Sequence, residues 1–312
     1  MEEQLWNACK DGIIEEVVKL LQNSQISTNW NDSEYSRTPL YVACGKGYLE
    51  IVKLLLSDQR VDINQSNKYD LTPFYAACKE GHIDIVKLLL KDERVYINHN
   101  KYGFTPFYAA CENAQIEIVK LLLNDQRVDV NKANIGEITP FWIACSNGHV
   151  DIVKLLLNGE RIYINKANQS GWTPFYVACK EGHIETVGLL LNDKRVDVNK
   201  ADVRNSYTPF SIACKNGHIE IVKLLLNDQR IDINKADSRG ITPFWIACGR
   251  ASLEIIESII ASGREVNVNT KDNQGKTEIN MIRIKEMKKK HLGKVKKNFK
   301  KEKEIVQRLL NY

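Results

Sequence analysis

The chain has 312 residues, of which 43% are apolar and 27% are charged. This composition is too apolar for a disordered chain, and because no run of about eighteen apolar residues occurs, it is also too polar for a membrane-spanning helix. We therefore expect a soluble, folded protein. The length alone is typical of two ordinary domains, but that estimate does not hold for a sequence that repeats itself.

The net charge of +5 combines two unlike parts of the chain. Residues 276–312 contain thirteen lysines and arginines against four acidic residues, whereas the remaining residues contain 31 against 35. A slightly acidic body is therefore followed by a strongly basic segment.

A Thr-Pro dipeptide recurs every 33 to 35 residues and uses all seven prolines of the chain. The dipeptides begin at Thr38, Thr72, Thr105, Thr139, Thr173, Thr208 and Thr242. The eight cysteines keep the same spacing, at Cys9, Cys44, Cys78, Cys111, Cys145, Cys179, Cys214 and Cys248. Such regular spacing predicts about nine repeats in place of two domains.

The third copy shows what each part of a repeat is expected to do. Thr72-Pro73 can cap and begin a short first helix, and Gly81 can adopt the left-handed conformation that ends it. A second, apolar helix is expected from Ile83 to Leu90. Residues 95–97 then alternate as an extended segment, and residues 98–104 form a turn that leads to the next Thr-Pro.

This unit resembles the ankyrin repeat, in which two antiparallel helices are followed by a β-turn finger. The matching strings are Thr72-Pro73-Phe74-Tyr75-Ala76-Ala77-Cys78 with Gly81-His82, Thr173-Pro174-Phe175-Tyr176-Val177-Ala178-Cys179 with Gly182-His183, and Thr208-Pro209-Phe210-Ser211-Ile212-Ala213-Cys214 with Gly217-His218. The resemblance extends over about residues 4–275 and implies an all-α solenoid of about nine stacked helix pairs. Since one pair cannot bury both its faces, its stability is expected to come from its neighbours.

The resemblance also implies how the chain is divided. Residues 1–275 correspond to the repeat array, in which residues 1–33 form an N-terminal cap that precedes the seven Thr-Pro repeats. Residues 276–312 correspond to a modified C-terminal capping repeat with long basic helices.

Six of the seven copies carry an aromatic residue where the ankyrin pattern has the histidine of its T-P-L-H motif. These residues are Tyr41, Tyr75, Tyr108, Trp142, Tyr176 and Trp245, and Ser211 is the exception. In the family this histidine ties the finger to the helix by hydrogen bonds, so the tie must be made differently here. We interpret the aromatic column as packing between repeats.

Three repeats are predicted to be less stable than the others. Asn113-Ala114-Gln115 and Arg250-Ala251-Ser252 lack the glycine between the two helices, and a non-glycine residue in a left-handed turn costs about 1 to 2 kcal/mol. Gly188 lies inside a helix, where glycine costs about 1 kcal/mol. Repeats four, six and eight are therefore the expected weak points.

Neither the histidines nor the cysteines have the pattern of a catalytic or metal site. Four histidines recur at one point of the repeat, at His82, His149, His183 and His218. Because residues one repeat apart cannot assemble into a single active site, we interpret them as structural. We expect no enzymatic activity and no cofactor.

The cysteines are expected to be reduced. Stacked helices are about 8 to 10 Å apart, whereas a disulfide needs Cα atoms within about 7 Å. The thiols should therefore act as small apolar side chains, which fits a reducing compartment. The first nine residues carry acids where a signal peptide would carry basic residues. We expect an intracellular, cytoplasmic monomer, with the nucleus as an alternative location.

The residue before Thr-Pro is apolar in six consecutive copies. These residues, called here the apolar ladder, are Leu71, Phe104, Ile138, Trp172, Tyr207 and Ile241. In ankyrin repeats this position points to solvent on a concave face that binds partner proteins, so the ladder is a candidate contact surface. The alternative is that neighbouring fingers pack these side chains against one another. Further candidates on the same face are Tyr69, Tyr102, Arg204 and Arg239 on the fingers, and Lys79, Glu80, Lys180, Glu181 and Arg250 after the cysteines.

The basic segment begins a ninth unit that contains an insertion of fifteen residues relative to the other copies. It carries Lys288, Lys289, Lys290, Lys296, Lys297, Lys300 and Lys301. One interpretation is a solvated cap of the array. The other is a binding segment for something acidic, namely a calmodulin-like partner, an anionic membrane or nucleic acid.

Overall fold

The computed structural model describes residues 1–250, 252–267 and 270–275. The expected C-terminal capping repeat and its lysines at 288–290, 296–297 and 300–301 lie outside the described residues.

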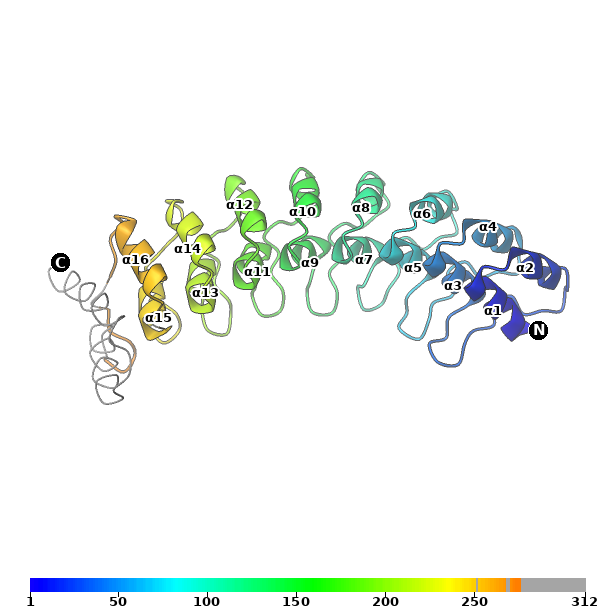
Figure 1. Ribbon diagram of the computed structural model, residues 1–312, viewed down its shortest axis with the longest axis horizontal. Coiled ribbons are helices and arrows are strands. Elements are labelled where there is room, and N and C mark those ends of the chain that lie inside the picture. The colour runs from blue at the N-terminus through cyan, green and yellow to red at the C-terminus, as the bar shows by residue number, and fades with distance from the viewer. Residues whose placement is uncertain (251, 268–269, 276–312) are drawn as a thin grey trace. The chain divides into compact units, whose positions relative to one another are not determined.

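The described residues form sixteen helices in eight pairs, which confirms the expected helical repeat fold (Figure 1). The first helices of the pairs are α1 (Glu2–Asp11), α3 (Pro39–Lys46), α5 (Pro73–Glu80), α7 (Pro106–Glu112), α9 (Pro140–Ser146), α11 (Pro174–Glu181), α13 (Pro209–Asn216) and α15 (Pro243–Arg250). The second helices are α2 (Ile14–Leu21), α4 (Leu49–Ser57), α6 (Ile83–Leu90), α8 (Ile116–Leu123), α10 (Val150–Leu157), α12 (Ile184–Asn192), α14 (Ile219–Leu226) and α16 (Leu253–Ala261).

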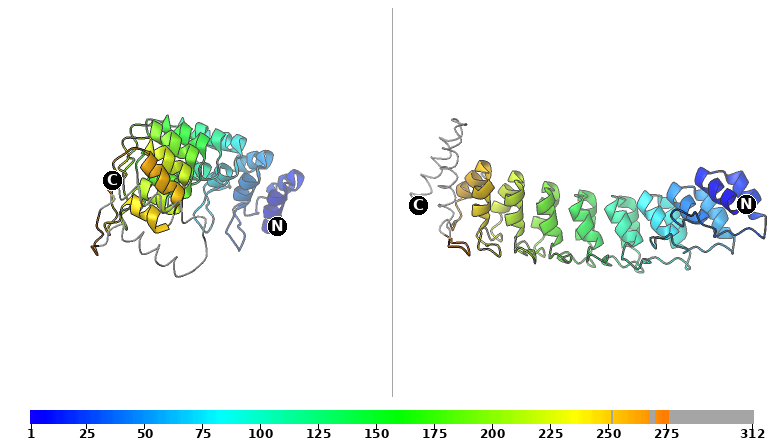
Figure 2. Two further views of the ribbon diagram at one scale, coloured as in Figure 1. Left: turned by 60° about the vertical axis from the view of Figure 1, so that its left-hand side comes forward. Right: turned by 90° about the horizontal axis from the view of Figure 1, so that it is seen from below.

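The chain divides into two compact units. The first comprises residues 1–144 and 149–163, and the second comprises residues 145–148 and the described residues from 164 onward. Within each unit, the first helices of neighbouring repeats pack against one another, and so do the second helices. The loops before each Thr-Pro, called fingers here, extend from the row of first helices on the side away from the second helices (Figures 1 and 2).

The helix boundaries follow from the local signals in each repeat. The hydroxyl oxygen of Thr72 accepts the N–H of Tyr75 at 3.2 Å, and Pro73 is the first residue of α5. Gly81 ends α5 in the left-handed conformation, with a φ of 89°. In repeat four, Ala114 takes the same conformation with a φ of 58°, as the missing glycine predicts.

The core lies between the helices of successive repeats. All eight cysteines are buried and none forms a disulfide, as expected from their spacing. Burial raises the pKa of the Cys9 thiol to about 12, and it also raises the pKa of six others, namely Cys44, Cys78, Cys111, Cys145, Cys179 and Cys214. Most of the aromatic column is also buried, namely Tyr75, Tyr108, Trp142, Tyr176 and Trp245, whereas Tyr41 is half-buried. Its interpretation as packing between repeats stays a prediction.

The recurring histidines tie each repeat to the one before it. The Nε2 of His82 lies 3.1 Å from the carbonyl oxygen of Gly45, and that of His218 lies 2.9 Å from the carbonyl oxygen of Lys180. A carbonyl oxygen can only accept, so Nε2 carries the proton. Gln115 replaces the histidine in repeat four and donates in the same way to the carbonyl oxygen of Lys79. These histidines are therefore structural.

A column of asparagines joins the loops that follow the second helices. The Nδ2 of Asn64 donates to the carbonyl oxygen of Arg94 at 2.7 Å, and its Oδ1 accepts the N–H of Tyr96 at 2.8 Å. Within the described residues, the asparagines that make this pair of bonds to the next repeat are Asn29, Asn64, Asn98, Asn131, Asn165, Asn199 and Asn234. Each repeat is thereby held in register with its neighbour.

Candidate partner-binding surface

Each finger is built around one Asn or Asp side chain that is buried or half-buried beneath it. The Oδ1 of Asn67 accepts the N–H of Tyr69 at 2.9 Å and that of Leu71 at 3.1 Å. The other residues in this role are Asp32, Asn100, Asn134, Asn168, Asp202 and Asp237. Because the side chain fixes the backbone on both sides of the tip, the fingertip residues are held in one orientation.

One of these side chains makes a tie between helix and finger of the kind that the histidine makes in the ankyrin pattern. The hydroxyl of Tyr176 donates to the Oδ2 of Asp202 at 3.2 Å, which links α11 to the finger of the next repeat. Sequence reasoning missed this column, although it left a signal: an Asn or Asp stands five or six residues before every Thr-Pro threonine.

Neighbouring fingers are also joined through their backbones. In the first unit, the N–H of Ile135 donates to the carbonyl oxygen of Tyr102 at 2.9 Å. In the second unit, the N–H of Val203 donates to the carbonyl oxygen of Ser170 at 3.1 Å. The fingertips of each unit therefore form a connected surface.

Several fingertips expose large apolar side chains. In the first unit, the exposed fractions are 52% for Tyr69, 40% for Tyr102 and 66% for Ile135, and in the second unit Val203 is 71% exposed. Ile135 and Val203 were not among the residues predicted from sequence. The sequence pattern that could have identified them is an apolar residue directly after the finger's Asn or Asp. Other copies carry a polar residue at this position, namely Lys68, Lys101, Gln169 or Ser238.

The apolar ladder lies at the base of the fingers and is only partly accessible. Leu71, Phe104 and Ile138 in the first unit are half-buried, and so are Trp172 and Ile241 in the second unit. Tyr207 is buried, with 6% exposed.

Two aromatic ladder residues, Phe104 and Trp172, pack against the aromatic column of their own first helix. The Phe104 ring meets the Tyr108 ring edge-on with centroids 5.4 Å apart, and the Trp172 ring stacks on Tyr176 at 5.7 Å. The structure therefore shows intra-repeat packing on one side of these rings. The role of the ladder in binding a partner stays a prediction.

The two predicted arginines lie on fingers of the second unit and are exposed. Arg239 donates through Nη2 to the Oδ2 of Asp237 at 2.8 Å and to the hydroxyl oxygen of Tyr207 at 2.8 Å. The bond to Asp237 is the main reason why the pKa of Arg239 is raised. Arg239 thus joins a fingertip to the apolar ladder, whereas Arg204 projects from the neighbouring finger.

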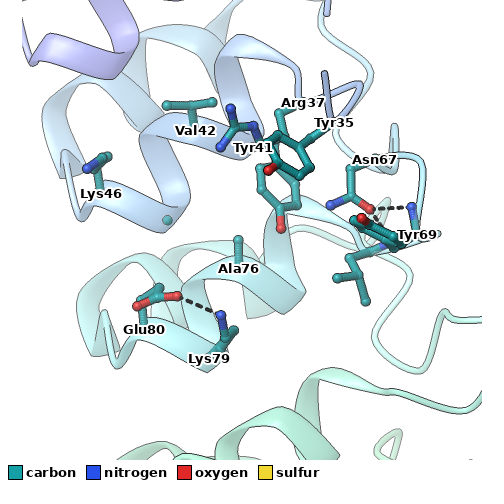
Figure 3. A pocket seen from close by; sticks show the side chains of 12 residues that line it. Tyr35, Arg37, Tyr41, Val42, Lys46, Asn67, Tyr69, Ala76, Lys79 and Glu80 are labelled. Carbon is teal, nitrogen blue, oxygen red and sulfur yellow. Dashed lines mark hydrogen bonds and ion pairs between the residues drawn. The ribbon is translucent and has the colours of Figure 1, made fainter. Parts of the chain in front are cut away.

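The first unit also contains an open pocket of about 460 Å³ between α3 and α5 (Figure 3). Its base is formed by Val42, Gly45 and Ala76, and the side chains of Tyr41 and Tyr69 stand beside it. Burial raises the pKa of Tyr41 to about 12.

The entrance of this pocket is lined with cations. Arg37, Lys46 and Lys79 line it together with a single acid, Glu80, which lies 3.3 Å from Lys79. Behind Arg37 lies Asp32, which burial would make less acidic, but the N–H of Tyr35 and the Arg37 guanidinium hold its pKa below the ordinary value. The surface is therefore positively charged around an apolar base.

The described residues contain no group of His, Cys, Asp and Glu side chains arranged to hold a metal ion. No helix in the described part of the chain is long and apolar enough to cross a membrane.

Comparison with protein-family models gives matches over most of the chain. Residues 59–134, 130–202 and 195–272 each match a model described as "Ankyrin repeats (3 copies)", and residues 20–74 match one described as "Ankyrin repeats (many copies)". A search of curated proteins found no match.

Proposed function

Since the chain belongs to the ankyrin repeat family, whose repeats are in general protein–protein interaction modules, we propose that it is a scaffold that binds a partner protein through its finger face. The finger face comprises the fingertips and the exposed sides of the first helices. The observation that carries this proposal is the exposure of Tyr69, Tyr102 and Ile135 on adjacent fingers of the first unit.

Apolar side chains on a surface that is already ordered are well suited to binding. Association costs less when the contacting groups are fixed beforehand, and exposed aromatic residues supply much of the binding energy at protein interfaces. The fingers meet this condition because Asn67, Asn100 and Asn134 hold their backbones. The exposed fingertip residues differ between repeats, whereas the hydrogen bonds beneath them recur. A surface of this kind favours binding of one particular partner along the finger face.

A binding role without catalysis is supported by the roles of the reactive residue types. All eight cysteines are buried, and burial raises the pKa of thiols such as those of Cys78 and Cys145, which makes them poor nucleophiles at neutral pH. The Nε2 atoms of His82, His149 and His183 already bind backbone carbonyl oxygens. The absence of disulfides among the eight cysteines also supports a reducing compartment, which we take to be the cytoplasm, with the nucleus as the alternative.

The proposal is tested by affinity capture from extracts of the native cell, followed by mass spectrometry. The test variant combines Tyr69→Ala, Tyr102→Ala and Ile135→Ala. The matched control combines Tyr96→Ala and Tyr163→Ala, since these tyrosines are 60% and 64% exposed on loops after the second helices. We expect the partner to be lost from the test variant and retained by the control. Equal capture by both variants would refute the finger face as the binding site.

The basic segment supports a second candidate function, an adaptor that is brought to an acidic target by residues 276–312. The supporting observation is its charge of thirteen lysines and arginines against four acids. Such binding should weaken steeply as salt rises, because released counterions drive it. Vesicles with anionic lipid, duplex DNA and calmodulin are the three probes, and deletion of residues 283–303 should abolish binding. If binding survives this deletion, the basic segment is not what binds the acidic target.

A further inference from the structure

We propose that the pocket between α3 and α5 receives one apolar side chain of a partner peptide whose flanking residues are acidic. This inference rests on the proposed function as a protein-binding scaffold, and it assigns the kind of partner segment that one part of the finger face recognises.

The pocket exists because two small residues face each other across neighbouring repeats. A Cβ atom added to Gly45 would lie 3.7 Å from the Cβ of Ala76. In later repeats the position of Gly45 holds Lys79, Glu112, Ser146, Lys180, Lys215 and Gly249, and the position of Ala76 holds Ala109, Ile143, Val177, Ile212 and Ile246. Among adjacent Thr-Pro repeats, glycine therefore faces alanine only here. The hollow is specific to this pair of repeats.

The sides of the pocket suit an apolar ligand group. Figure 3 shows the Tyr41 ring reaching from α3 toward α5, with Tyr35 beside it. The rings of Tyr35 and Tyr69 lie with centroids 6.5 Å apart, on two neighbouring fingers. With Val42 at the base, these groups offer a side chain apolar contact on several sides, and a volume of about 460 Å³ lies within the range of ligand pockets.

The charges at the entrance select acidic residues on either side of that anchor. Lys46 is exposed at the end of α3, and the Nζ of Lys68 lies 4.4 Å from the centroid of the Tyr35 ring. Arg37 is partly neutralised by Asp32 and Lys79 by Glu80, but the exposed pair between Lys79 and Glu80 contributes little energy and can separate. Positive potential around the opening therefore attracts carboxylates and guides the peptide to the pocket.

The probe for this inference is a phage-displayed library of random linear peptides, selected against the full chain. We expect the selected peptides to share a leucine, methionine or phenylalanine flanked by Asp or Glu. Their binding, measured by fluorescence polarisation of synthetic copies, should weaken as salt rises, since the charges involved are exposed. Selected peptides without acidic flanks would overturn the inference.

Two substitutions test whether the peptide binds in the pocket. Ala76→Ile fills the hollow with a residue that other repeats carry at this position, and it should weaken peptide binding by about tenfold or more, as expected for loss of an anchor. Ala109→Ile makes the same change in the next repeat, outside the pocket, and should bind as the unmodified chain does. Equal binding by the two variants would overturn the inference. Circular dichroism and thermal unfolding check that both are folded.

A charge variant keeps the test informative if Ala76→Ile does not fold. Lys46→Glu should weaken peptide binding several-fold, whereas Lys91→Glu, at an exposed position outside the pocket, should not. Equal affinities of these two variants would count against the inference.

Pocket-dependent binding of a single-stranded oligonucleotide in place of peptides would also overturn the inference. If Ala76→Ile still captures the cellular partner while the fingertip variant does not, the proposed function stands and the pocket inference fails.

Discussion

The side chain of Asn64 makes two hydrogen bonds to the loop of the next repeat. In one of them, its Oδ1 accepts the N–H of Tyr96 at 2.8 Å. Both groups of the amide are used, since Nδ2 donates to the carbonyl oxygen of Arg94. Both hydrogen bonds join Asn64 to the next repeat. The asparagine therefore stabilises the stack and not the single helix pair.

Asn64→Ala should lower the free energy of unfolding by about 1 to 3 kcal/mol, because two hydrogen bonds between repeats are lost. Asn64→Asp should cost at least as much, since a carboxylate cannot donate and would face the carbonyl oxygen of Arg94. Urea unfolding followed by circular dichroism measures both. Gln65→Ala at the next position is the control and should change stability little. An unchanged midpoint for Asn64→Ala would show that water replaces these bonds at no cost.

Ala114→Gly should stabilise the protein by about 1 kcal/mol, because Ala114 has a φ of 58° and glycine adopts this conformation without strain. The reverse change at the equivalent position, Gly148→Ala, should destabilise. Gly148 has a φ of 69°, and an added Cβ would lie 2.5 Å from the Nδ1 of His183. Denaturant midpoints and hydrogen exchange of repeat four measure the effect. A destabilised Ala114→Gly variant would contradict the argument.

The helix pairs could be predicted from sequence because their signals are local. Thr72-Pro73 and Gly81 each determine the backbone within a few residues of themselves, and the structure places the helix ends there. The pocket could not be predicted in this way. Gly45 and Ala76 are ordinary small residues in the sequence, and they form a hollow only because the stacking register brings them together.

The accessibility of the apolar ladder depended in the same way on contacts that sequence does not show. Tyr207 is buried because its hydroxyl meets Arg239 and its ring is covered by Lys215, whose Nζ lies 4.3 Å from the ring centroid. Ile135, by contrast, follows the buried finger residue Asn134, and its own side chain is turned outward.

Gly188→Ala should stabilise the sixth repeat by about 1 kcal/mol, because glycine inside a helix is less favourable than alanine by that amount. The space is available: the nearest atom to an added Cβ is the Cδ2 of Leu224 at 3.9 Å, an ordinary contact. The thermal midpoint should therefore rise. As a control, Gly182→Ala should lower it, since Gly182 has a φ of 90°. A lower midpoint for Gly188→Ala would mean that α12 and α14 cannot accommodate the methyl group.

The protein should lose stability as pH rises above about 8.5, where thiols of an unfolded chain ionise. Burial keeps the thiols of Cys78 and Cys111 protonated in the folded state, because it raises their pKa values. The unfolded state then binds fewer protons than the folded state, so the free energy of unfolding falls by up to about 1.4 kcal/mol per pH unit for each buried thiol. Urea unfolding between pH 7 and about 9.5, below the ordinary pKa of tyrosine, measures this slope.

The double variant Cys78→Ala and Cys111→Ala is the control for this pH dependence. Its absolute stability should be lower because two side chains are truncated in the core, but its slope should be flatter. Equal slopes in the two proteins would show that other groups cause the alkaline loss.

Alanine substitutions in the apolar ladder should separate its packing role from a role in binding. Phe104→Ala should lower the free energy of unfolding by about 1 to 2 kcal/mol, because the ring is only half-buried and loses its contact with Tyr108. Circular dichroism should stay unchanged, as it should for Ile138→Ala and Trp172→Ala. Each variant should also capture less of the partner than Tyr96→Ala does. Unfolding of the array, or undiminished capture by all three, would leave the ladder a packing feature alone.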